Sequence, residues 1–137
     1  MVGTSSAFVL TSTLVVKTLF KTIHMSIVTE FNDYRARMNE RILAGKNKTI
    51  QKIYNADTTA YQDGALDAKT KELLGLVASM VLRCDDCIRY HVQECHALGV
   101  NEAELMEVMG IANLVGGTIV IPHTRRAVEF WDALENK

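Results

Sequence analysis

Residues 67–99, DAKTKELLGLVASMVLRCDDCIRYHVQECHALG, decide the fold class of this 137-residue chain. Asp67 is a suitable N-cap for a helix over 68–82, and that helix is apolar on nearly all sides, which is typical of a buried helix. A further helix carries two closely spaced cysteines and ends at Gly99, a residue that suits a helix C-terminus. The stretch shows no alternation of period two, so the sequence predicts an all-α protein.

Two helices are expected on the N-terminal side of this stretch. The first would be capped by Ser26 or Thr29 and run to Arg41, with Gly45 as its stop. The second is weaker and spans residues 49–61. Three of its side chains are expected to face inward: Ile50, Ile53 and Tyr54.

Two more helices are expected on the C-terminal side. Asn101 and Glu104 have the spacing of a capping box, so one helix should begin there and end at residues 116–117, which are both glycine. Pro122 suits the first turn of the last helix. Four of that helix's residues are predicted to be buried: Ala127, Val128, Trp131 and Leu134. The whole chain should therefore form about six helices in one domain.

The composition narrows the class of protein. A hydrophobic share of 48% in 137 residues is enough for one domain with its own core. The net charge is −1 with interspersed signs, which does not indicate a nucleic-acid or membrane partner. Three cysteines, an odd number, do not suit a secreted disulfide scaffold. We therefore expect a cytoplasmic protein in a reducing compartment.

The N-terminal residues 1–24 are apolar and rich in serine and threonine. Lys17 and Lys21 follow the apolar runs, whereas a secretory signal has its positive region first. Polar residues also interrupt the roughly 20 apolar residues that a membrane span needs. We expect an extension of undetermined role: a dispensable segment, a helix that packs on a partner subunit, or a targeting signal. The domain itself is expected over residues 25–137.

Three residues of the fourth predicted helix could act together chemically. Cys84, Cys87 and His91 stand at positions i, i+3 and i+7, so they share one face, and Cys87 and His91 are neighbours one turn apart. A thiolate is a nucleophile, and a neighbouring imidazole can take up the thiol proton and later return it. The alternative is that the cysteines are small core residues and His91 a core histidine.

Glu72 is the fourth candidate residue. It shares a stripe of small or polar residues with Gly75, Ser79 and Arg83 on an otherwise apolar helix, so a neighbouring helix could approach closely there. A carboxylate at such a seam would be partly desolvated and suited to proton transfer. One continuous helix would hold Glu72 about 18 Å from Cys84, at 1.5 Å per residue. The two can cooperate only if the chain turns near Arg83.

Glu72 followed by Cys84-x-x-Cys87-x-x-x-His91 resembles the alkyl hydroperoxidase D-like branch of the carboxymuconolactone decarboxylase family. The resemblance covers roughly residues 25–134. It implies an all-helical fold, a homo-oligomer such as a trimer or hexamer, and no cofactor or metal. It also implies reduction of a hydroperoxide with electrons from a dithiol or a protein donor. By this resemblance Cys87 attacks, Cys84 resolves it as a disulfide, and His91 and Glu72 relay protons.

One position departs from the pattern of that family. Its hydroperoxidase members often have a histidine directly before the second cysteine, where this chain has Asp86 beside Asp85. Two carboxylates near the thiols would disfavour thiolate formation through like-charge repulsion. Helix geometry also favours Cys84 as the thiol of lower pKa if it lies at the helix start. The resemblance favours Cys87 as the attacking residue, and we adopt Cys87.

Three other functions remain alternatives at this point. A zinc site could use the two cysteines and His91, with Cys95, His96 or His123 as a further ligand. The other branch of the family decarboxylates a lactone without a cysteine pair. A non-catalytic oligomeric protein could also carry the motif. We expect Cys95 to be a packing residue and His123 to lie at the surface or at a helix cap.

Overall fold

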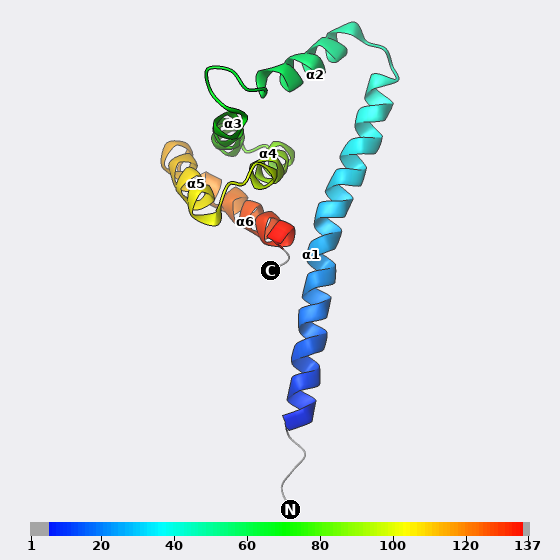
Figure 1. Ribbon diagram of the computed structural model, residues 1–137, viewed down its shortest axis with the longest axis vertical. Coiled ribbons are helices and arrows are strands. Elements are labelled where there is room, and N and C mark those ends of the chain that lie inside the picture. The colour runs from blue at the N-terminus through cyan, green and yellow to red at the C-terminus, as the bar shows by residue number, and fades with distance from the viewer. Residues whose placement is uncertain (1–5, 136–137) are drawn as a thin grey trace, which may run out of the picture.

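The computed structural model describes residues 6–135, and six α-helices account for most of this part of the chain (Figure 1). Their bounds are α1 Ser6–Leu43, α2 Lys48–Ala60, α3 Ala68–Leu82, α4 Asp85–Ala97, α5 Glu102–Gly116 and α6 Ile121–Glu135. A short 3-10 turn, Thr118–Val120, precedes α6. No strand occurs within residues 6–135, and the predicted all-α class is confirmed.

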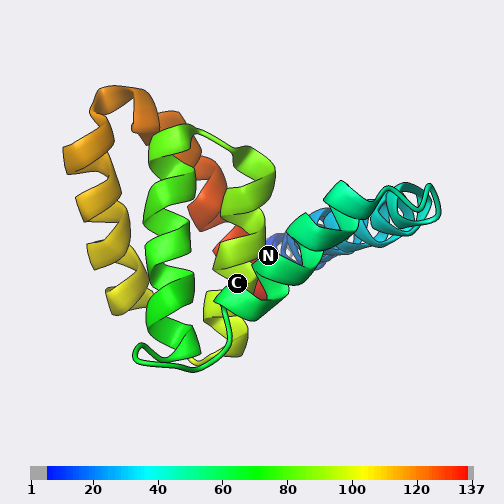
Figure 2. The same ribbon diagram turned by 90° about the horizontal axis from the view of Figure 1, so that it is seen from above.

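Helices α3 to α6 form the body of the protein, with α3 packed against α4 and α5, and α4 against α6 (Figure 2). The largest side chains of the core are fully buried and come from all four helices. They include Leu76, Met80, Ile88, Leu105, Met109 and Phe130. Helix α1 lies along α6, where Phe31 meets Phe130 edge to face with ring centroids 5.4 Å apart. Helix α4, which carries the cysteines, is thus held between α3 and α6.

Sequence signals placed the helix starts of the body correctly. The Asp67 side chain accepts a hydrogen bond from the backbone N–H of Thr70, so α3 begins at its predicted cap. Asn101 and Glu104 form both hydrogen bonds of the predicted capping box. Such caps satisfy backbone donors that the first helical turn leaves free. Local side chains therefore fix where α3 and α5 begin.

The start of α1 was predicted wrongly. Ser26 and Thr29 lie inside a helix that already begins at Ser6, and the N-terminal half of α1 extends beyond the body (Figure 1). Residues 6–24 contain no glycine or proline, and a helix that has nucleated propagates through residues of ordinary propensity. The predicted boundary between an extension and the domain at Met25 therefore has no break in the backbone. Residues 1–5 lie outside the described part.

Helix α2 is more exposed than its pattern predicted. Ile53, expected to face inward, is 61% exposed, and Ile50 and Tyr54 are only partly covered. The helix links the end of α1 to α3 and meets the body only at its C-terminal end (Figures 1 and 2). An amphipathic pattern predicts which face of a helix is apolar, but not whether another helix covers that face.

Helix α3 is not buried all round as predicted. Glu72, Leu76, Ser79 and Met80 are buried, but Leu74 is 57% exposed and Leu82 is 75% exposed. The side of α3 that faces away from α4 and the core therefore stays uncovered in a single chain. Within residues 6–135, no helix combines the length and the apolar character that crossing a membrane requires.

Candidate active site

The chain turns between α3 and α4, as cooperation between Glu72 and the cysteines requires. Arg83 adopts a left-handed conformation with φ of 61°. Its N–H donates to the carbonyl of Met80, and the N–H of Cys84 donates to the carbonyl of Ser79, at 3.0 Å each. This pattern closes a helix, usually with glycine at the left-handed position. Placing a non-glycine residue in the left-handed conformation costs roughly 1–2 kcal/mol of conformational free energy. The contacts of the folded protein must offset this cost at Arg83.

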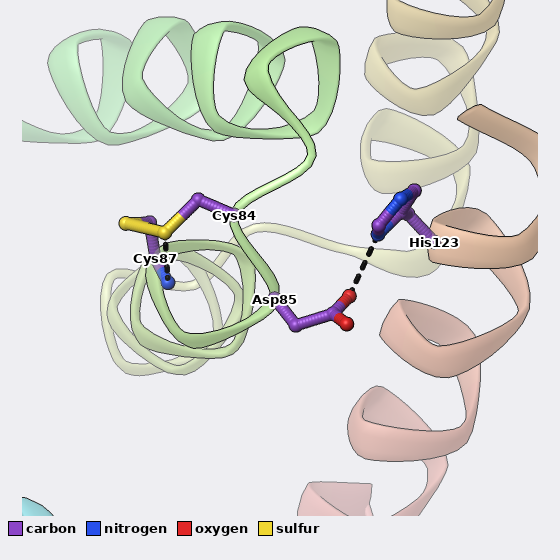
Figure 3. The surroundings of a disulfide bond; sticks show 4 residues. All are labelled: Cys84, Asp85, Cys87 and His123. Carbon is purple, nitrogen blue, oxygen red and sulfur yellow. Dashed lines mark hydrogen bonds and ion pairs between the residues drawn. A yellow bond between two sulfur atoms is a disulfide. The ribbon is translucent and has the colours of Figure 1, made fainter. Parts of the chain in front are cut away.

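Cys84 and Cys87 lie at the first turn of α4 and are joined by a disulfide (Figure 3). Their Cα atoms are 5.3 Å apart. Cys84 is the N-cap, and the backbone N–H of Cys87 points at its sulfur with an N–S distance of 3.4 Å. Cys84 is partly buried, whereas Cys87 is exposed. A reagent from solvent therefore reaches Cys87 more easily than Cys84.

Glu72 and His91 form a buried hydrogen-bonded pair across the seam between α3 and α4. The Oε2 atom of Glu72 lies 2.6 Å from Nδ1 of His91, and the two residues are only 3% and 7% exposed. With Glu72 ionised, its carboxylate can only accept, and Nδ1 of His91 is the donor. The other ring nitrogen, Nε2, is then the free basic atom. His91 follows Cys87 by one helical turn.

Gly75 makes this close approach possible. A Cβ atom built at this position would lie 2.6 Å from Cε1 of His91 and 2.6 Å from the hydroxyl of Tyr61. Real Cβ atoms essentially never come that close to another heavy atom. The small-residue stripe that was predicted from Glu72 to Ser79 thus lies where α4 packs, while Arg83 at its end is exposed.

Two tyrosines that sequence reasoning missed flank His91. The ring centroids of Tyr61 and Tyr90 each lie 5.3 Å from that of His91, at interplanar angles of 44° and 65°. Burial, followed by the negative charge of nearby carboxylates including Glu72, raises the pKa of both hydroxyls. Tyr90 also stacks under the guanidinium of Arg35 at 4.1 Å. Tyr61 comes from the end of α2, and no local pattern indicated that it would reach His91.

The two aspartates beside the cysteines behave differently from each other. Asp85 points away from the sulfurs toward α6 (Figure 3), where its Oδ1 atom lies 2.7 Å from Nδ1 of His123 and 3.1 Å from Nε of Arg126. Burial alone would raise the pKa of Asp85, but the hydrogen bonds from His123 and Arg126 outweigh it and lower that pKa. Asp86 is exposed to solvent. The repulsion expected from the sequence is thus weakened for Asp85, whose carboxylate is held by the guanidinium of Arg126 and by a hydrogen bond with His123.

Two further histidines that the structure describes have partners of their own, and the third cysteine lies in the core. His96 lies 2.6 Å from the carboxylate of Glu135, and His123 binds Asp85 rather than a cysteine. Cys95 is fully buried in the core, as expected for a packing residue. Among the residues that the structure describes, no group of three or more histidine, cysteine or acidic residues is arranged to hold a metal ion.

We expect chemical labelling to separate Cys95 from the other two cysteines. Burial raises the pKa of its thiol to about 12, so Cys95 should resist alkylation in the folded protein. Mass spectrometry should show Cys84 linked to Cys87 after mild oxidation, and label on these two alone after reduction. Cys95→Ala is the control and should give the same pattern. A bridge that contains Cys95 would overturn the assignment.

Comparison with known proteins gives one family. Residues 48–130 match the model of the carboxymuconolactone decarboxylase family. A solved protein of Thermotoga maritima is 49% identical, with a TM-score of 0.76 over 77% of this chain and 93% of that one. A second structure of it, with a TM-score of 0.74 at 77% and 90% coverage, is described as a member of this family with a suggested part in the antioxidative response.

More distant relatives agree with this result. A family member from Legionella pneumophila is 29% identical, with a TM-score of 0.58 over 82% of this chain and 94% of that one. An uncharacterised protein of Cupriavidus necator is 32% identical over 75 residues, which are 55% of this chain. These residues span 66% of that relative, just under two thirds of its length. A protein encoded in the cox locus of Paracoccus denitrificans is 28% identical, with 55% and 68% coverage.

Proposed function

The chain belongs to the carboxymuconolactone decarboxylase family, and from this premise we propose that it is a thiol-dependent peroxidase of the alkyl hydroperoxidase D-like branch. One observation carries the proposal: the buried Glu72–His91 pair joins α3 to α4, and its histidine follows Cys87 of the Cys84–Cys87 disulfide by one turn of α4. Peroxide reduction by thiols needs a cysteine pair and, close to it, a base that can accept the thiol proton, here the imidazole of His91. The suggested antioxidative role of the Thermotoga relative supports the same class of reaction.

The first step is attack of the Cys87 thiolate on the hydroperoxide. The sulfur bonds to the terminal oxygen, the O–O bond breaks, and the remaining oxygen leaves as an alcohol after it takes up a proton. Cys87 becomes a sulfenic acid. Nε2 of His91 accepts the thiol proton and returns it to the leaving oxygen, because Glu72 holds the other nitrogen in its protonated form. The exposure of Cys87 lets the peroxide reach it.

The second step closes the disulfide. The Cys84 sulfur attacks the sulfenic sulfur of Cys87, the S–O bond breaks, and the hydroxyl leaves as water after it takes up the proton that the Cys84 thiol gives up. The N–H of Cys87 and the N-terminus of α4 both favour a thiolate on Cys84. This position suits Cys84 to the role of the resolving thiol, without making it the attacking one.

The third step restores the dithiol with two electrons from an external dithiol. Its thiolate attacks the exposed sulfur of Cys87 and expels Cys84, which leaves readily as a stabilised thiolate. The second donor thiol then displaces Cys87, and the donor ends as a disulfide. This need for a reductant fits a reducing compartment such as the cytoplasm.

A coupled assay tests the proposal. With a hydroperoxide and a small dithiol, the protein should consume one peroxide for each dithiol that is oxidised, and it should consume none without the dithiol after the first turnover. The double variant Cys84→Ser/Cys87→Ser supplies the background. Consumption no faster than this background, with every dithiol tried, would contradict the proposal.

We also propose that a second copy of the chain covers the apolar face of α3 and α5. A groove of about 550 Å³ runs between these helices, with Leu74, Val81, Leu82, Ile111 and Val115 among its lining residues. On α5, the neighbouring Leu114 is 84% exposed. Contiguous apolar surface of this kind marks interaction sites in soluble proteins. The resemblance to a family of homo-oligomers supports the same occupant.

Light scattering should therefore give a mass above 15.3 kDa at micromolar concentration. Ile111→Glu places a charge in the groove and should shift the protein toward the monomer, because a buried unpaired charge is strongly unfavourable. Leu98→Glu is the matched control, since Leu98 is exposed at the end of α4 and does not line the groove. A monomeric wild type would rule the proposal out.

A further inference from the structure

We propose that Tyr61 is a positioning residue that shields the Glu72–His91 hydrogen bond from water. Its meaning for catalysis rests on the proposed function, but the shielding itself can be tested apart from activity. Tyr61 comes directly after α2 and reaches across to the seam between α3 and α4. Nothing in the peroxidase mechanism above uses it.

The geometry places the Tyr61 hydroxyl at the edge of His91 that faces Glu72. The hydroxyl oxygen and Cε1 of His91 lie within 2.6 Å of the same point above Gly75, and Nδ1 of His91 lies 3.0 Å from it. Nδ1 is the ring nitrogen that is hydrogen-bonded to Glu72. The hydroxyl end of Tyr61 therefore lies on the Cε1–Nδ1 side of the imidazole, near the nitrogen that takes part in this hydrogen bond.

The charges around Tyr61 favour a neutral hydroxyl at this position. Burial, then the charges of Glu72 and Asp57, raise the pKa of Tyr61, so the hydroxyl stays protonated and adds no negative charge beside the Glu72 carboxylate. Tyr90 stands edge to face on His91 from within α4 itself. The imidazole is thus bordered by two tyrosine rings, one from α4 itself and one from the end of α2.

Helix α2 has few contacts with the body, and Tyr61 lies at its C-terminal end, where the backbone carbonyl of Gln62 accepts a hydrogen bond from Lys71 of α3. No residue of α2 itself is buried, and one of its described polar links is the hydrogen bond from the Tyr54 hydroxyl to Asn39 of α1, at 2.9 Å. Tyr61 holds the other end of α2 against the site. If the hydrogen bond between Glu72 and His91 is exposed to water, the Nδ1 proton exchanges faster and the ring tautomer is less well fixed.

Proton NMR of the imidazole tests this inference. A histidine N–H proton is seen at low field only when it is hydrogen-bonded and protected from exchange with water. The wild type should show this signal for Nδ1 of His91, and Tyr61→Phe, which keeps the ring, should retain it. Tyr61→Ala should lose the signal or exchange it at least about tenfold faster. Ile53→Ala is the matched control on the same helix and should retain it, because Ile53 is 61% exposed.

A second variant keeps the inference testable if Tyr61→Ala does not fold. Gly75→Ala adds the methyl group that must displace the Tyr61 hydroxyl or the His91 ring, so it should also speed the exchange. Unchanged exchange in both variants would overturn the inference, as would an equal loss in Ile53→Ala. A shielded signal in a protein without peroxidase activity would instead refute the proposed function alone. The pH profile of Cys87 alkylation should shift in Tyr61→Ala and stay unshifted in Ile53→Ala.

Discussion

Replacing Cys87 by serine is expected to abolish peroxide turnover. The hydroxyl of serine is far less nucleophilic toward oxygen than a thiolate, and Cys84 lacks an imidazole one helical turn beyond it. The loss should be on the order of 10⁴-fold or more, as for other covalent nucleophiles. Stopped-flow measurement of hydroperoxide consumption with an excess of dithiol checks this result.

Two further variants make the result specific. Cys84→Ser should consume one equivalent of peroxide in a single turnover and leave a sulfenic acid on Cys87, which a sulfenic-acid trap and mass spectrometry would locate. Cys95→Ala should turn over like the wild type, because Cys95 is a buried packing residue on the same helix. If Cys87→Ser kept the single turnover and Cys84→Ser lost it, the roles of the two cysteines would be reversed.

Much of the fold could be predicted because its signals are local. The bounds of α3 and the capping box of α5 follow from side chains within one turn of each helix start. The break at Arg83 had no glycine or proline to indicate it, and we inferred it only from the requirement that Glu72 reach the cysteines. The structure supplies the reason, because Schellman-type hydrogen bonds hold Arg83 in a left-handed conformation.

The features that sequence reasoning missed depend on contacts between distant segments. Tyr61 reaches His91 from 30 positions away, and Asp85 finds His123 and Arg126 on α6. Neither pairing has a spacing rule, since both depend on how whole helices pack. The same holds for the exposed Ile53, whose helix has an apolar face with no helix against it. Periodicity gives the face of a helix, whereas tertiary packing decides what covers it.

The Asp85 network also changes how the departure from the family pattern should be judged. A histidine before the second cysteine would bring a positive charge close to the thiols, and Asp86 brings a negative one. Asp86 is exposed, however, and solvent screens its effect. Asp85 is held by His123 and Arg126 and turned away from both sulfurs (Figure 3). The carboxylate that matters most for the mechanism is therefore Glu72.

Glu72→Gln is expected to slow peroxide turnover by about 10²-fold while keeping the fold, since one acid–base group is lost. Glutamine has the same shape and can still accept from Nδ1 of His91, so the free energy of unfolding should fall by no more than about 1–3 kcal/mol. It lacks the negative charge, and so it no longer stabilises the imidazolium that forms when His91 takes the thiol proton.

The matched control for this variant is Glu94→Gln. Glu94 is a partly buried carboxylate on α4, and burial followed by the charge of Glu72 raises its pKa, so it belongs to the same electrostatic environment. The carboxylate that hydrogen-bonds His91 is nevertheless that of Glu72. If the hydrogen-bonded pair is the relay, Glu94→Gln should keep a rate near that of the wild type. Equal losses of rate in both variants would mean that the combined negative charge of the nearby carboxylates matters, rather than the Glu72–His91 hydrogen bond. An unchanged rate in Glu72→Gln would exclude the proton relay.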